Sequence, residues 1–381
     1  MRPHIILQQS MSADTIVSKP HYRILDGLRG VAALMVVAMH IFETHASTYH
    51  EMIINHGYLA VDFFFVLSGF VIGYAYDDRW NKLTTKEFFI RRLARLQPMV
   101  IMGMVIGAIF FYTQDGSFWP KISEVPVWSM LLIMLLGFFM IPVPPSMDIR
   151  GWAEMYPLNG PGWTLFFEYI GNILYATILR RISNTILAIL VFLAACFLTH
   201  MAVTGKGDVI GGWAIDMVNI HIGFARLLYP FLAGLLLSRM AKLIYIKNAF
   251  LWCSLLIITA LSIPRIGGQD NLWMNGIYES LIIIFLFPAI VYMGASGDVK
   301  GKFSSKLCNF LGHISYPIYI THYPLIYTYT AWVKNNKLTL QEAFPGALLV
   351  FFSAILLAWA CLKLYDEPVR KWLTAKFITR K

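Results

Sequence analysis

The sequence has few charged residues for its length. Only 14% of its 381 residues are Asp, Glu, Lys or Arg, whereas 58% are hydrophobic. Soluble domains carry roughly 25% charged and about 45–50% apolar residues, so this chain lacks the polar side chains needed to cover a surface in water. The shortage excludes an ordinary soluble enzyme and indicates a protein with several membrane-spanning segments.

Cysteine is also scarce, and its spacing fits neither a zinc site nor a disulfide framework. The chain has four cysteines and no C-x-x-C pair, so no metal site is predicted. No Lys/Arg-rich stretch is interleaved with aromatic residues, which excludes nucleic acid as a partner despite the net charge of +10. In a membrane protein such an excess is expected in the cytoplasmic loops.

Apolar runs of about 20 residues, the length needed to cross a bilayer, recur along the chain. The candidate segments are 24–44, 57–76, 97–113, 127–143, 162–180, 185–203, 219–238, 248–264, 275–295, 312–333 and 344–364. Residues 1–22 are polar and unpatterned, which predicts a flexible N-terminal tail, and residues 373–381 are expected to form a basic cytoplasmic tail.

Orientation follows from Lys and Arg in the short connecting loops. Basic stretches lie at 79–95, 180–181, 239–247, 300–306 and after 363, and all are expected in the cytoplasm. Three candidate spans lie between the first two stretches, and an odd number of crossings would put these stretches on opposite sides of the membrane. One proline-rich segment between 97 and 161 is therefore expected to be re-entrant or interfacial. The sequence therefore predicts an all-α, polytopic transmembrane bundle of about ten spanning helices plus one such segment, with both termini cytoplasmic.

Ionisable side chains inside predicted spans mark candidate functional sites, because they are costly in a bilayer. Arg29 and His40 lie eleven residues apart on the first span, about three turns and roughly 16 Å along one helix face. Asp62 opens the second span at the expected depth of His40, and an aspartate can orient a histidine that acts as a general base. Alternatively, Arg29 is an interfacial side chain, His40 bonds a neighbouring carbonyl, and Asp62 caps its helix.

Further polar residues extend this candidate site. Arg92 and Arg95 share a helix face at the cytoplasmic surface, where arginine forks bind phosphates, although plain topology or anionic lipid explains them equally. Glu168 lies well inside an apolar segment, which favours a function over a structural polar network. Four further residues are expected to support the site or bind substrate: Ser68 through helix packing, Trp163 as an interfacial anchor, Tyr316 at the cytoplasmic mouth and His322 in the middle of a span. Arg226 and Arg265 lie near span ends and are expected to reflect membrane topology.

Several of these motifs together resemble the acyltransferase-3 family of integral membrane acyltransferases. The motifs, in order, are Arg29-x10-His40, VDFFFVLSGF at 61–70, RRLARLQP at 91–98, WTLFFE at 163–168, LGHISYPIYITHYPL at 311–325 and YDEP at 365–368. Each is weak alone, but their order and spacing over nearly the whole chain are specific. The resemblance implies a membrane acyltransferase domain over residues 23–372.

The resemblance also implies a reaction, which is O-acyl, usually O-acetyl, transfer to a carbohydrate of the bacterial envelope. It would make His40 catalytic, with Asp62 and Glu168 at acidic positions of the family motifs, and Arg29, Arg92 and Arg95 functionally required. We expect no tightly bound cofactor, with acyl-CoA (acetyl-CoA) as co-substrate. An O-antigen, exopolysaccharide or related glycan is the expected acceptor, and the inner (plasma) membrane the expected location. Some relatives carry a further periplasmic hydrolase-like domain; we expect this chain to lack it, so that the membrane domain would complete the transfer itself or use a separate partner.

The residues suggest a mechanism and leave several functions open. CoA phosphates would meet Arg92 and Arg95, and His40, oriented by Asp62 or Glu168, would deprotonate a sugar hydroxyl. A secondary transporter of a small polar or acidic solute would also bury His, Arg and Glu in a bundle. A non-catalytic assembly protein and an acyltransferase acting on a lipid or small metabolite fit the same residues as well.

Overall fold

The computed structural model describes residues 19, 21–119, 122–299 and 301–378, and the regular elements there are all helical. The prediction of a flexible tail over 1–22 falls mostly outside the described residues. Lys19 and His21 are described and contact the body of the protein, through Asp78 at 2.8 Å and Asp26 at 2.6 Å respectively. The end of the predicted basic tail, 379–381, is likewise outside them.

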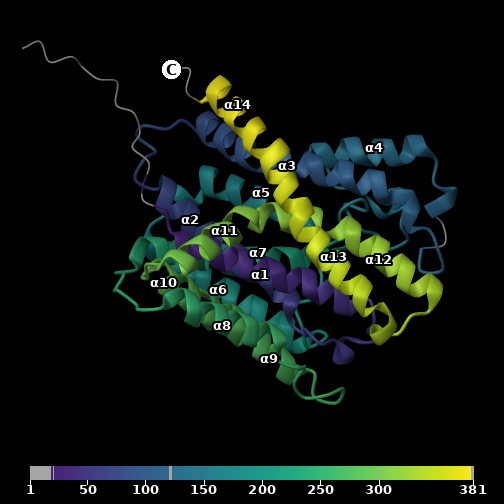
Figure 1. Ribbon diagram of the computed structural model, residues 1–381. Coiled ribbons are helices and arrows are strands. Elements are labelled where there is room, and N and C mark those ends of the chain that lie inside the picture. The colour runs from purple at the N-terminus through teal and green to yellow at the C-terminus, as the bar shows by residue number, and fades with distance from the viewer. Residues whose placement is uncertain (1–18, 20, 120–121, 300, 379–381) are drawn as a thin grey trace, which may run out of the picture.

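The helices follow one another along the chain (Figure 1), and the longest connection between them is the irregular segment 139–161. Their bounds are α1 Arg23–Glu43, α2 Ala60–Tyr76, α3 Thr85–Phe110, α4 Val127–Phe138, α5 Gly162–Thr177, α6 Asn184–Thr204, α7 Met217–Met240, α8 Ala249–Ser262, α9 Trp273–Leu281, α10 Phe287–Ala295, α11 Lys302–Thr321, α12 Tyr323–Asn336, α13 Leu340–Cys361 and α14 Glu367–Phe377. Two π-helical turns, Ile282–Leu286 and Leu362–Asp366, join α9 to α10 and α13 to α14.

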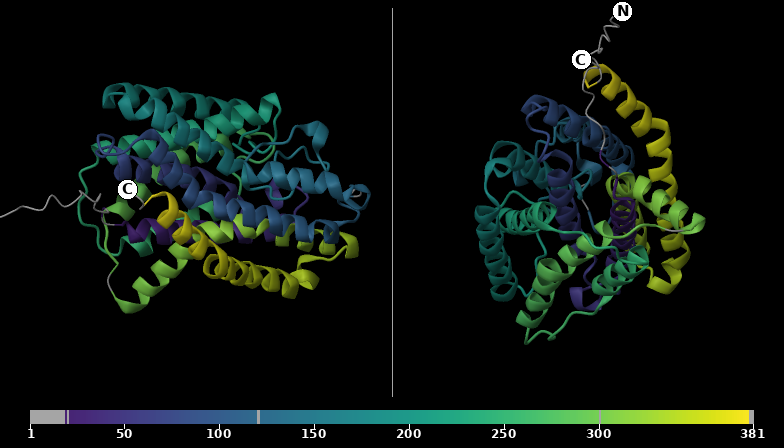
Figure 2. Two further views of the ribbon diagram at one scale, coloured as in Figure 1. Left: turned by 90° about the horizontal axis from the view of Figure 1, so that it is seen from above. Right: turned by 90° about the vertical axis from the view of Figure 1, so that its left-hand side faces the viewer.

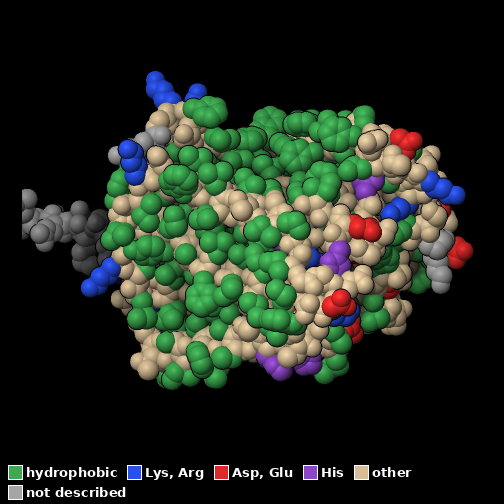
Figure 3. Space-filling model, turned by 90° about the horizontal axis from the view of Figure 1, so that it is seen from below, with side chains coloured by type: hydrophobic (Ala, Val, Ile, Leu, Met, Phe, Trp, Pro, Cys, Tyr) green, Lys and Arg blue, Asp and Glu red, His purple; other side chains and the backbone are tan. Residues whose placement is uncertain are grey.

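These helices form a bundle with a hydrophobic surface, as expected for a protein in a bilayer. Seven helical stretches among the described residues are long and apolar enough to cross a membrane, and Val127–Phe138 and Ala249–Ser262 are shorter apolar helices. Figure 2 shows the helices running roughly side by side, with α13 and α14 forming a long arm along the outside. Figure 3 shows a broad hydrophobic belt with charged side chains gathered toward the two ends. The predicted polytopic helical bundle is confirmed.

The predicted basic stretches meet at one end of this bundle, here called the basic end. Arg239 pairs with Asp77 at 2.6 Å and donates to the Leu179 carbonyl at 3.0 Å, and the Arg180 guanidinium stacks on Trp80. The start of α1 and α14 line one cavity there. Among the described residues, seven helical stretches are long and apolar enough to cross a membrane, so the number of ten crossings stays a prediction.

The segment that does not cross is α4 with the loop that follows it. Tyr112, just after α3, donates to the Val125 carbonyl at 2.8 Å, and Gln97, fifteen residues earlier, donates to the Phe138 carbonyl. These two bonds place the start of α4 beside the end of α3 and the end of α4 beside Gln97. Because fifteen helical residues span about 22 Å, α4 enters from the end of the bundle opposite the basic end and reaches about half the depth of α3. Loop 139–161 then returns, since Val143 and Met155 pair at 3.0 Å and Met155 bonds Trp213 at 2.8 Å. The predicted re-entrant segment is therefore α4.

Glycines allow the central helices to pack closely. A Cβ atom at Gly69 on α2 would collide with the carbonyl oxygen of Phe231 on α7, and one at Gly234 with the carbonyl oxygen of Val66. Gly30 on α1 stands in the same relation to Leu311 on α11. Small residues let membrane helices approach until their backbones touch, and these pairs bring α1, α2, α7 and α11 together around the polar residues described below.

Two sequence-based boundaries were wrong. The basic stretch 79–95 is not a loop throughout, because Thr84 and Glu87 form a capping box that starts α3 at Thr85. Segment 312–333 is not one continuous span, because α11 ends at Thr321 and α12 begins at Tyr323, with His322 between them. Pro324 lies in the first turn of α12, where a missing N–H costs a helix nothing.

Candidate active site

A cavity of about 600 Å³ opens at the basic end and is lined by α1, α2, α3, α5, α11 and the start of α14. Its lining contains the three predicted arginines, Arg29, Arg92 and Arg95, together with Ser68, Glu168 and Tyr316. The structure therefore brings six of the predicted site residues together around one cavity. The cavity is also lined by Arg23 and Arg370, near the two ends of the chain, and by the carboxylates of Asp26, Asp366 and Glu367.

The three arginines differ in how their charge is balanced. Arg92 bonds Glu168 at 2.6 Å, and Arg29 contacts Asp26 at 3.2 Å and donates to Ser315 at 2.8 Å. Among the described residues, Arg95 has no hydrogen-bond or ion-pair partner. Asp26 and Glu168 lie near enough to interact with Arg95 electrostatically, but because neither bonds it, its guanidinium is the one of the three that could bond a phosphate without breaking an ion pair.

Aromatic rings close the inner end of the cavity. Phe64 and Tyr319 line it there and contact edge to face, with ring centroids 5.3 Å apart. The Tyr319 hydroxyl is held at 3.0 Å from Thr164, and its ring lies 6.1 Å from that of His322. The cavity thus ends directly against the histidines that lie deeper in the bundle.

His40 lies beyond this wall with a carboxylate on one ring nitrogen. Its Nδ1 is 2.7 Å from Oε2 of Glu43, one turn further along α1. An ionised carboxylate only accepts hydrogen bonds, so in the neutral imidazole Nδ1 is the nitrogen that carries the proton and Nε2 the one with the lone pair. This is the carboxylate–histidine arrangement that orients a general base.

A second histidine stacks beside the first. The rings of His40 and His322 lie 5.7 Å apart, and Tyr323 contacts His40 edge to face at 4.7 Å. Nδ1 of His322 bonds the Ile318 carbonyl at 2.9 Å, and its buried Nε2 has no partner among the described residues. Since a carbonyl only accepts, His322 also presents an unprotonated Nε2. The break between α11 and α12 is what places this ring against α1.

The predicted orientation of His40 by Asp62 or Glu168 was wrong. Asp62 binds Arg226 of α7 at 2.6 and 3.2 Å, and both side chains are almost fully buried. Glu168 accepts from Arg92 at 2.6 Å and from Ser68 at 3.2 Å. Each carboxylate is thus paired with an arginine from another helix, and Glu43 is the acidic group at His40.

The supporting residues show two more differences from the sequence-based expectations. Trp163 is only 8% exposed and lies under the Arg226 guanidinium at 5.3 Å, so it is a packing partner of the buried ion pair and not an interfacial anchor. Arg226 is therefore internal and not topological. The hydroxyl of Tyr316 donates to the Leu96 carbonyl at 2.7 Å and fixes α11 against α3 beside the cavity.

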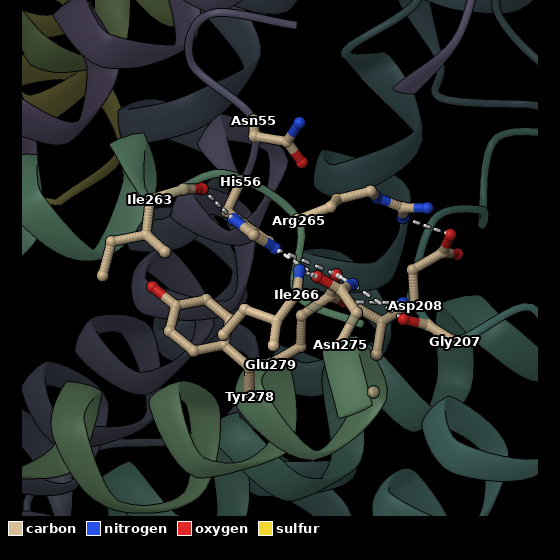
Figure 4. A network of polar contacts seen from close by, with 12 residues as sticks. Asn55, His56, Gly207, Asp208, Ile263, Arg265, Ile266, Asn275, Tyr278 and Glu279 are labelled. Atoms are coloured by element: carbon tan, nitrogen blue, oxygen red, sulfur yellow. Dashed lines mark hydrogen bonds and ion pairs between the residues drawn. The ribbon is translucent and has the colours of Figure 1, made fainter. Parts of the chain in front are cut away.

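A separate polar cluster at the opposite end holds the connecting loops together (Figure 4). His56 bonds the Ile263 carbonyl at 2.8 Å and Asn275 at 2.9 Å, and Asn275 bonds Gly207 and Glu279, each at 2.7 Å. Arg265 pairs with Asp208, so it too is internal to the protein and not merely topological. The central groups of this cluster bond one another, so the cluster stabilises the packing of these loops against each other.

The fold and site define a multi-pass membrane protein with an arginine-lined cavity leading toward a carboxylate–histidine pair. Residues 22–363 match the model of the acyltransferase-3 family, described as an acyltransferase domain. The chain belongs to this family.

Individual relatives agree with this membership. The chain is 25% identical over 391 aligned positions to the peptidoglycan O-acetyltransferase OatA of Listeria monocytogenes, covering 95% of this chain and 58% of that protein. It is 22% identical over 363 positions to the O-acetyltransferase OatA of Staphylococcus aureus, covering 92% and 58%. It is 32% identical over 160 positions to protein 2 in the picA locus of Rhizobium radiobacter, covering 40% and 80%.

The chain spans less than two thirds of the length of the two OatA proteins. No solved structure matches it.

Proposed function

We propose that this protein is a membrane O-acyltransferase that moves an acyl group, most simply acetyl, from acyl-CoA to a hydroxyl of an envelope glycan. The observation that carries the proposal is an arginine-lined cavity whose inner wall, Tyr319, adjoins His322, together with the His40–Glu43 pair on which His322 stacks. The family membership and the OatA relatives support acyl transfer, and the glycan acceptor follows from what those relatives are named for. CoA is argued from the chemistry of the cavity alone.

The basic end is assigned to the cytoplasm, where acyl-CoA is found, and the protein to the plasma (inner) membrane. Lys and Arg collect in cytoplasmic loops of membrane proteins, and the stretches that meet at this end carry most of those in the connecting loops. Both chain ends then lie in the cytoplasm. His40, seventeen residues along α1 from Arg23, falls about 25 Å from the cytoplasmic end of that helix.

The reaction is written as direct transfer. The CoA phosphates bind at Arg95, with Arg29 and Arg92 beside it, and the thioester passes the Phe64–Tyr319 wall to reach His40. Nε2 of His40 takes the proton of the acceptor hydroxyl as its oxygen attacks the thioester carbonyl carbon. The carbon–sulfur bond breaks, the thiolate of CoA leaves, and the imidazolium returns the proton to that sulfur. Glu43 stabilises the imidazolium while it exists.

Replacing Arg95 by alanine is expected to weaken donor binding. One charge-assisted hydrogen bond to phosphate contributes about 1.5–3 kcal/mol, so KM for acetyl-CoA should rise roughly 10–100-fold with little change in kcat. Steady-state kinetics in detergent or vesicles measure both constants. The matched control is Lys86→Ala, an exposed cation on the same helix outside the cavity lining. An unchanged KM for Arg95→Ala would exclude the phosphate role.

Replacing Glu43 by glutamine is expected to slow the chemical step. The amide removes the negative charge that stabilises the imidazolium, and the loss of one charge-assisted hydrogen bond, about 1.5–3 kcal/mol, corresponds to roughly a 10–100-fold slower step. We expect kcat to fall by this factor while KM for acetyl-CoA stays constant. Glu51→Gln, an exposed carboxylate on the following loop, serves as control. Equal kcat values for the two variants would remove Glu43 from the mechanism.

The proposed function is tested most simply in cells. Envelope glycans from a strain lacking the gene, from the same strain complemented with wild type, and from one complemented with His40→Ala are compared by mass spectrometry. The proposal predicts an acyl-mass increment on one glycan that only the wild-type gene restores. Identical glycan spectra in all three strains would contradict it.

A further inference from the structure

The loop that returns from α4 forms a buried charged cluster at the opposite end of the bundle. Arg150 and Glu154 on this loop are 3% and 5% exposed. Arg150 donates through Nε to the Pro157 carbonyl at 2.9 Å and through Nη2 to Gln114 at 2.8 Å. Glu154 accepts from the Tyr327 hydroxyl at 2.6 Å. Sequence reasoning passed over both residues.

Aromatic rings lead from this cluster to the surface. The Arg150 guanidinium stacks on Tyr327, with its central carbon 3.6 Å from the ring centroid, and lies 5.0 Å from that of Trp119. Trp119 contacts Trp152 at 6.2 Å, and Trp152 is 47% exposed. A row of aromatic faces therefore connects the exterior with a buried arginine and carboxylate.

Two hydrogen-bond donors in this cluster have no acceptor. Nη1 of Arg150 and Nε1 of Trp119 are buried and without a partner among the described residues. Buried donors in native proteins are nearly always satisfied, and each exception calls for an explanation. The backbone here is also strained, since Ala153, next to Glu154, has a φ of 54°, and such strain concentrates at functional sites.

The cluster adjoins the proposed base. The Tyr323 ring lies 4.5 Å from Tyr327 on one side and 4.7 Å from His40 on the other. A Cβ atom at Gly160 would lie 2.8 Å from the Tyr323 ring and 3.0 Å from the Tyr327 hydroxyl, so only glycine allows the loop to approach so closely. One turn of α12 therefore separates the cluster from the residue that would activate the acceptor.

We propose that Trp119, Arg150, Trp152 and Glu154 form a subsite for a sugar ring of the carbohydrate acceptor. The inference rests on the proposed function and deepens it. The C–H face of a pyranose stacks on an indole ring, its oxygens accept from the two unpartnered donors, and one hydroxyl donates to Glu154. The carboxylate disfavours a phosphate or another anion at the same place, so an uncharged sugar ring fits better than a lipid headgroup.

The test uses the full-length protein in liposomes with radiolabelled acetyl-CoA and chitopentaose as the probe acceptor. Trp152→Ala and Glu154→Gln are each expected to raise the acceptor KM at least about tenfold, the size expected for one lost stacking contact or buried hydrogen bond. Without chitopentaose, water is the acceptor of the acetyl group, and the rate of this hydrolysis reports on the donor site separately from the sugar subsite. Trp273→Ala, also 47% exposed at this end, is the control with unchanged kinetics.

The outcomes separate this inference from the proposed function. Acceptor KM values at the wild-type level in both subsite variants, with His40→Ala inactive, would overturn the subsite and leave the function standing. Wild-type protein that hydrolyses acetyl-CoA to acetate and CoA but acetylates no chitopentaose would overturn the sugar assignment. Wild-type protein that consumes no acetyl-CoA at all would overturn the proposed function. Size-exclusion chromatography checks that Glu154→Gln, a substitution at a buried position, folds like wild type. Trp152→Ala changes an exposed side chain, so it tests the subsite even if Glu154→Gln fails to fold.

Discussion

Alanine in place of His40 is expected to reduce kcat for acyl transfer by about 10²–10⁴-fold, the usual contribution of a general base. The imidazole Nε2 is the proton acceptor in the proposed reaction, and neither Glu43 nor the neighbouring Tyr323 replaces it. KM for acetyl-CoA should stay constant, because the cavity that binds the donor does not include His40. Transfer of radiolabelled acetyl from acetyl-CoA to a glycan measures both constants.

The matched control is His50→Ala, an exposed histidine on the loop that follows α1. We expect wild-type kinetics from it. Because His322 also presents a free Nε2 beside His40, the double variant should be no slower than His40→Ala if His40 alone is the base. Wild-type turnover in His40→Ala would remove this residue from the reaction.

Removing Arg226 is expected to have the largest effect on stability. The side chain pairs with Asp62 in the bundle interior, and both are at most 2% exposed. Breaking a buried pair leaves an uncompensated charge and costs about 3–5 kcal/mol. Arg226→Ala should therefore lower the free energy of unfolding by that amount, measured by denaturant titration of the detergent-solubilised protein.

The paired substitution shows whether charge is the cause. Asp62→Leu combined with Arg226→Met removes both charges and should recover most of the loss, since apolar replacements of buried pairs are often neutral or stabilising. Arg181→Ala, an exposed arginine, should change the free energy of unfolding by less than about 0.5 kcal/mol. A double variant as unstable as Arg226→Ala would show that Arg226 acts through packing on Trp163.

Much of the architecture could be predicted because it follows from local physical rules. The period of the α-helix put Arg29 and His40 on one face, and the three-residue spacing did the same for Arg92 and Arg95. Parity of the basic loops required one non-crossing segment between 97 and 161, and the structure identifies it as α4. These inferences need only the geometry of one helix or the asymmetry of charge across a bilayer.

The pairings between side chains of different helices and loops could not be predicted, because local periodicity does not show which helices pack together. The partner of Asp62 lies 164 residues away on α7, so the sequence did not indicate the pairing. Glu43 is different, because its three-residue separation from His40 is a signal that could have been used. Arg150 and Glu154 lie in an irregular proline-rich loop, where no helical or strand period assigns a side chain to a face.

We infer that acyl-CoA and the glycan acceptor enter from opposite ends of the bundle. Sealed liposomes of known protein orientation, with radiolabelled acetyl-CoA outside and chitopentaose inside, test this arrangement. We predict that esterified chitopentaose accumulates inside only where the basic end faces outward, and not with His40→Ala. Labelled acetyl-CoA entering the liposomes intact, or equal esterification in both protein orientations, would contradict the account.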